Sequence, residues 1–107
     1  MSDVGLTSIE DLRAMAPIEA GTLGHHTVLD TPSARVVVLA FESGHLMKGH
    51  RAPRPLLLQA LDGHLRITAD DRTVDLRPGG LLYLPASMTH AVEAVQPSRL
   101  CLTLLSG

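Results

Sequence analysis

Residues 77–90 read RPGGLLYLPASMTH: a turn of one proline and two glycines, a short apolar run, a second turn after a proline, and a histidine. The same alternation of turn residues and short apolar runs continues in both directions, with a turn roughly every ten residues. It predicts strands over residues 25–29, 34–41, 56–61, 64–69, 72–76, 81–84, 89–95 and 98–105. Eight or nine short strands are typical of an all-β sandwich or barrel.

Two local signals add detail to this fold. Asp62-Gly63 stands between two strand-like runs, and this dipeptide is the strongest short signal for a β-hairpin. Thr7 and Glu10 have the spacing of a capping box, which predicts a short helix over residues 8–15 that Pro17 ends. We therefore expect a single domain over residues 1–107, in which the helix precedes a barrel that spans residues 24–106.

The composition excludes several classes of function. The 107 residues are 45% hydrophobic and 19% charged, with a formal net charge of −2. A nucleic-acid-binding protein needs a basic field, and Phe41 and Tyr83 are the only aromatic residues that could stack on bases. The single cysteine, Cys101, excludes an internal disulfide, and the apolar runs are too short to span a membrane. We expect a cytoplasmic protein with neither nucleic acid nor membrane as a partner.

The spacing of glycine, proline and histidine over residues 44–90 resembles the two signature motifs of the cupin family. The positions that carry the resemblance are Gly44, His50, Gly63, Gly79, Pro85 and His90. Ser87 stands where the second motif has a glycine. The resemblance implies a double-stranded β-helix, or jelly-roll barrel. It also implies a metal site built from three histidines and a carboxylate, and a homodimer.

Only half of the family's metal ligands are present in this chain. By the resemblance, His50 falls on the first histidine and His90 on the last, whereas Ala52 replaces the second histidine and Leu56 the glutamate. Catalytic zinc sites keep three protein ligands, and iron or manganese sites add a carboxylate. A divalent metal (Zn, Mn, Fe or Ni) would therefore need a recruited ligand here. The histidines that could be recruited are His26 and His45.

The two replacements make the predicted barrel interior more apolar. The residues expected to line a ligand pocket are His50, Ala52, Leu56, Leu58, Met88 and His90. Three basic residues, Lys48, Arg51 and Arg54, cluster near the expected mouth of the barrel. They either attract an acidic ligand or belong to a solvated loop.

Two hypotheses about function follow. The first is a small cupin barrel that binds a small, partly apolar molecule beside an incomplete metal site. This hypothesis leaves open whether the molecule is anionic. The alternative is a metal-dependent cupin enzyme, a dioxygenase, isomerase or cyclase, that uses His50 and His90 together with a recruited histidine. His50 and His90 are the candidate catalytic residues in that case, because imidazole can act as acid or base near neutral pH.

Overall fold

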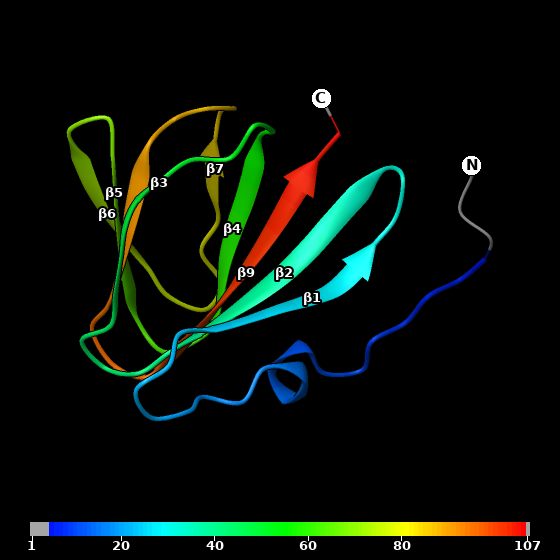
Figure 1. Ribbon diagram of the computed structural model, residues 1–107, viewed down its shortest axis with the longest axis horizontal. Coiled ribbons are helices and arrows are strands. Elements are labelled where there is room, and N and C mark those ends of the chain that lie inside the picture. The colour runs from blue at the N-terminus through cyan, green and yellow to red at the C-terminus, as the bar shows by residue number, and fades with distance from the viewer. Residues whose placement is uncertain (1–4, 107) are drawn as a thin grey trace.

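The computed structural model describes residues 5–106 and consists of two antiparallel sheets packed face to face (Figure 1). One sheet has the strand order β1-β2-β9-β4-β7 and the other β3-β8-β5-β6. The bounds are β1 Gly24–Asp30, β2 Ala34–Phe41, β3 Leu46–His50, β4 Leu56–Asp62, β5 Leu65–Ala69, β6 Arg72–Leu76, β7 Leu82–Leu84, β8 His90–Ala94 and β9 Ser98–Leu105. This confirms the predicted all-β barrel of the jelly-roll type.

Alternation of apolar and polar residues places the core between the two sheets. In β5, Leu65 and Ile67 are buried while Arg66 and Thr68 are exposed, because successive side chains of a strand point to opposite faces. The core is filled by aliphatic side chains and one aromatic, Phe41. Complete burial of a side chain of this size contributes about 1.5–3 kcal/mol.

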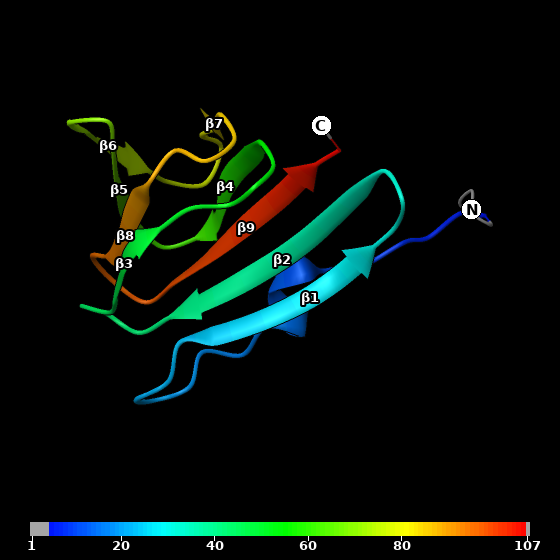
Figure 2. The ribbon, with the colours of Figure 1, turned by 45° about the horizontal axis from the view of Figure 1, so that its top comes forward.

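The N-terminal segment covers the outer face of the five-stranded sheet, behind β1 and β2 (Figure 2). Ala16 is fully buried there against Val38 and Ala40. The predicted helix over residues 8–15 is wrong, since this segment forms only a 3-10 turn, η1 Leu12–Met15. Asp11 caps that turn by accepting from the backbone N–H of Arg13 at 3.0 Å, so the turn begins later than the capping box indicated. Over residues 5–106, no helix is long and apolar enough to cross a membrane.

The predicted hairpin at Asp62-Gly63 is also wrong, because this turn carries the chain from one sheet to the other. β4 pairs with β7 and β9, whereas β5 pairs with β6 and β8. Gly63 has a φ of +77°, and a Cβ at this position would collide with Ser98 and with the carbonyl of Pro97. The crossing is held by hydrogen bonds from the backbone N–H of His64 to Ser98 Oγ, 2.9 Å, and from that of Arg99 to Asp62, 2.8 Å.

Strand β3 is the one strand that the sequence pattern did not locate. Its sequence, LMKGH, is short, polar and interrupted by Gly49, which adopts a φ of +47°. Pairing with β8 is irregular between Met47 and His50, so β3 is an interrupted edge strand rather than a regular one. The consequence for the site is that His50 lies directly opposite His90.

Candidate ligand-binding site

A cavity of about 260 Å³ lies between β3 and the inner face of the five-stranded sheet. Two thirds of its lining residues are apolar. They are Val37, Leu39, Met47, Ala52, Pro53, Leu56, Leu102 and Leu104. Sites for drug-sized ligands typically enclose about 300–1,000 Å³. The cavity therefore has room for a small ligand with an apolar body.

Four side chains that can carry positive charge complete the lining: His25, Arg35, His50 and Arg51. His25 pairs with Leu39 across β1 and β2, which places it on the inner face of the sheet. Arg35 shares that face, since it stands two residues before Val37 on β2. In the part of the chain that the structure describes, no aspartate or glutamate lines this cavity.

Arg35 is partly satisfied by a neighbouring strand. Its Nη2 donates to Thr27 Oγ1 on β1 at 3.3 Å, which holds the side chain across the edge of the sheet. Its Nε is buried and has no hydrogen-bond partner among residues 5–106. Buried polar groups in folded proteins are almost always hydrogen-bonded. The Nε–H of Arg35 is therefore a donor that is free to bind an acceptor on a ligand.

His50 and His90 lie edge to face, with ring centroids 5.6 Å apart and ring planes at 89°. His50 is exposed and lines the cavity, whereas His90 is only 1% exposed. His90 Nδ1 donates to the carbonyl of Met88 at 3.1 Å. Burial lowers the pKa of His90, against the effect of the Met88 carbonyl, and the nearby His50 lowers it further. The neutral ring then presents a buried Nε2 lone pair, which no donor within the described residues satisfies.

Sequence comparison places the chain in a family. A family model described as the AraC-like ligand binding domain matches residues 36–106. The chain belongs to this family. No curated protein gives a significant match to it.

Comparison with solved structures shows that this protein has the fold of a small cupin. A cupin superfamily protein from Desulfitobacterium hafniense aligns with a TM-score of 0.84 at 18% identity, over 97% of this chain and 95% of that one. An RmlC-like cupin from Desulfovibrio desulfuricans aligns with a TM-score of 0.82 at 21% identity, over 94% and 97%. A conserved protein of unknown function from Streptococcus pyogenes aligns with a TM-score of 0.82 at 22% identity, over 97% and 91%. These likenesses show the fold alone.

The residues of this domain do not fit the metal site that the resemblance to cupins implies. His26 pairs with Val38, whose side chain belongs to the outer cluster with Ala16, so His26 lies on the face away from the cavity. His45 is engaged in a turn, where its Nδ1 accepts from the backbone N–H of Glu42 at 3.3 Å. Within residues 5–106, nowhere do three or more histidine, cysteine, aspartate or glutamate side chains converge to hold a metal ion. The described residues thus show neither His26 nor His45 converging with His50 and His90, and recruitment of either histidine stays a prediction.

The residues predicted to line a ligand pocket lie in different places in the structure. His50, Ala52 and Leu56 line the cavity beside β3, whereas Leu58 is wholly buried in the core and His90 is buried without lining it. Of the three basic residues expected at the mouth, only Arg51 lines the cavity. His25 and Arg35 were missed. Alternation along residues 34–41 could have placed Arg35 with Val37 and Leu39, but nothing in the sequence says which of His25 and His26 faces inward.

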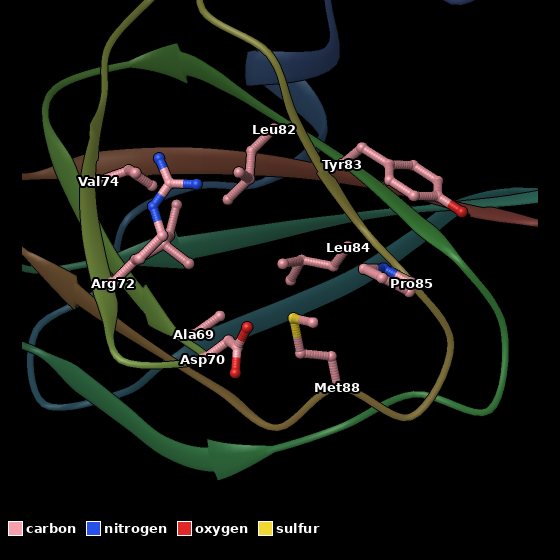
Figure 3. A pocket seen from close by; sticks show the side chains of 10 residues that line it. Ala69, Asp70, Arg72, Val74, Leu82, Tyr83, Leu84, Pro85 and Met88 are labelled. Carbon is pink, nitrogen blue, oxygen red and sulfur yellow. The ribbon is translucent and has the colours of Figure 1, made fainter.

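Met88 lines a second cavity instead, of about 210 Å³, between β6 and β7 (Figure 3). The side chains of Ala69, Val74, Leu82, Leu84 and Met88 border it, and the Tyr83 ring points away from it. Arg72 and Asp70 stand at its edge on the β5–β6 side. This cavity lies at the opposite edge of the barrel from the one that holds His50, because β7 and β6 are the outermost strands of their sheets there.

Proposed function

We propose that this cupin domain binds a small molecule with an apolar body in the cavity beside His50, next to an incomplete metal site. The observation that carries the proposal is the lining itself, an apolar wall with a few polar side chains from β1, β2, β3 and the residue that follows β3. Binding sites for small molecules have this composition, because the apolar wall supplies affinity while a few polar groups fix orientation. The family description, a ligand binding domain, supports the same function.

Each part of the site has a separate role in this proposal. Leu56, Leu102 and Leu104 contact the apolar body of the ligand, which leaves water at about 25 cal/mol per Å² of buried apolar surface. The exposed imidazole of His50 offers a donor or an acceptor to the polar end. His90 stands behind His50, edge to face with its ring, and is buried outside the cavity lining.

Titration with 1-hexanol, followed by amide NMR shifts, tests the proposal. We expect the shifts to concentrate on β2, β3, β4 and β9 around the cavity. Ala52→Phe should weaken binding by about tenfold or more, since its ring fills space that the ligand needs. Ala86→Phe is the matched control, because Ala86 is exposed and lines neither cavity. Shifts confined to β6 and β7, or unchanged binding in Ala52→Phe, would overturn the proposal.

The incomplete metal site has its own test. Two imidazoles are fewer than the three protein ligands of catalytic zinc sites, so we expect the purified domain to carry no stoichiometric metal. Elemental analysis of the parent protein and of His50→Ala and His90→Ala measures this directly. A stoichiometric metal that both variants lose would show that the site is complete, and would favour the alternative, a metal-dependent cupin enzyme.

A further inference from the structure

We propose that the ligand is an organic anion, a carboxylate on a small apolar body, and that Arg35 is the residue that selects it. This inference rests on the proposed function, because it names the ligand class for the same cavity. It goes beyond that function in assigning the charge of the ligand and the side chain that recognises it.

The charges around the cavity favour an anion. Arg35 and Arg51 are permanently protonated, and His25 and His50 add two further donors. No acidic side chain is among the described lining residues and neither guanidinium forms an ion pair there, although the exposed Asp30 stands opposite Arg35 in the β1–β2 register. Apolar walls concentrate such a field, because they exclude water that would screen it. A cation would be repelled, and a neutral ligand would leave both charges unpaired.

Arg35 differs from the paired arginines elsewhere in the protein. Arg99 donates to Asp62 Oδ2 at 2.6 Å and to the carbonyl of Ala16 at 2.7 Å, and Arg66 lies 3.3 Å from Asp75. Across the described range, 5–106, Arg35 forms no ion pair, and its one side-chain partner is the hydroxyl of Thr27. If Arg35 only stabilised the fold, we would expect its Nε–H to donate a hydrogen bond within the protein. That atom is instead buried and has no partner among the described residues.

The geometry of Arg35 suits a carboxylate in particular. Nε–H and the neighbouring Nη amines form a planar fork that matches two carboxylate oxygens. Because Thr27 already holds Nη2, the side chain is fixed before the ligand arrives, and less conformational entropy is lost on binding. The fork also stands on the same sheet face as Val37 and Leu39, so that a carboxylate bound to it would extend its apolar body along the cavity wall.

Calorimetric titration with hexanoate and 1-hexanol tests the inference, because the two compounds share a six-carbon body and differ in the anionic group. We expect the parent to bind hexanoate at least about tenfold more tightly, since a hydrogen bond to a charged group exceeds the free energy of a tenfold change in Kd. Arg35→Met should abolish the preference for hexanoate over hexanol. Arg72→Met is the control, because Arg72 lines the second cavity, and it should keep the preference.

The outcomes separate the two proposals. Equal affinities for the two compounds in the parent would overturn the inference and leave the proposed function standing. A preference that survives Arg35→Met would overturn the assignment to Arg35. Failure of both compounds to bind at the cavity would overturn the proposed function itself. If Arg35→Met does not fold, Arg35→Gln keeps an N–H donor without the charge, and it should lose the preference in the same way.

Discussion

Replacement of Gly63 by alanine should cost far more stability than the same change at another glycine of similar backbone conformation. Gly63 has a φ of +77° and Gly44 one of +82°. A Cβ on Gly44 would have no atom within 4 Å, whereas one on Gly63 would collide with Ser98 and with the carbonyl of Pro97. The pair of variants therefore separates backbone strain, which both share, from steric conflict, which only Gly63→Ala meets.

The magnitudes follow from these contacts. Gly44→Ala should lose about 1–2 kcal/mol, the cost of a side chain in a left-handed conformation. Gly63→Ala bears the same cost and adds about 1–3 kcal/mol of overpacking. Displacement of Ser98 also breaks the bond from the backbone N–H of His64 to Ser98 Oγ, and a buried donor left unsatisfied costs about 1–3 kcal/mol. The expected loss is about 5 kcal/mol, against a total of roughly 5–15 kcal/mol for a domain of this size.

Urea unfolding followed by far-ultraviolet circular dichroism measures the difference, and fluorescence is unsuitable because the chain has no tryptophan. If Gly44→Ala folds and Gly63→Ala does not, the result supports the reasoning in the same way as a large loss of unfolding free energy in Gly63→Ala. Equal losses in the two variants would refute the reasoning, because they would show that Ser98 and Pro97 move aside at no cost.

Two further predictions concern titratable groups. Burial lowers the folded-state pKa of His90 below its ordinary value of 6.5, so the unfolded chain takes up the proton first and stability falls as the pH decreases through 6.5. His90→Gln should remove this part of the pH dependence in urea unfolding; an unchanged profile would contradict it. Burial also raises the pKa of the Cys101 thiol, which is 5% exposed, although a hydrogen bond to the Thr103 side chain opposes the shift. Iodoacetamide should therefore label Cys101 in urea and not in native buffer, and rapid native labelling measured by mass spectrometry would count against this burial.

Most strands could be predicted because their signals are local. Apolar alternation and turn residues located eight of the nine strands described over residues 5–106, and the span of β2 matched the prediction at both ends. The role of Asp62-Gly63 could not be predicted in the same way, because a turn dipeptide does not say which strand the next segment will pair with. That choice depends on Ser98 and Arg99, which lie more than thirty residues away and bond to the turn.

The site was predictable only in part, for a similar reason. The family spacing located His50, Ala52 and Leu56, and all three line the cavity. Arg35 was missed because a charged residue at the start of an apolar strand is normally assigned to the solvent side. Alternation along β2 would have placed it with Val37 and Leu39, whereas the register of β2 against β9 and the bond to Thr27 on β1 are not visible in a single sequence.

The central position of β9 has a consequence for how the domain assembles. β9 lies between β2 and β4, and its partners Val37 and Leu58 precede Leu102 by large stretches of chain. During synthesis, β2 and β4 therefore emerge with one apolar edge unpaired and must wait for residues 98–105 before the sheet can close. Pairing over such sequence distances is slow, on the order of milliseconds to seconds for all-β domains. The interval before β9 docks is when the nascent barrel is most prone to aggregate, and a chain truncated before residue 98 would remain in that state.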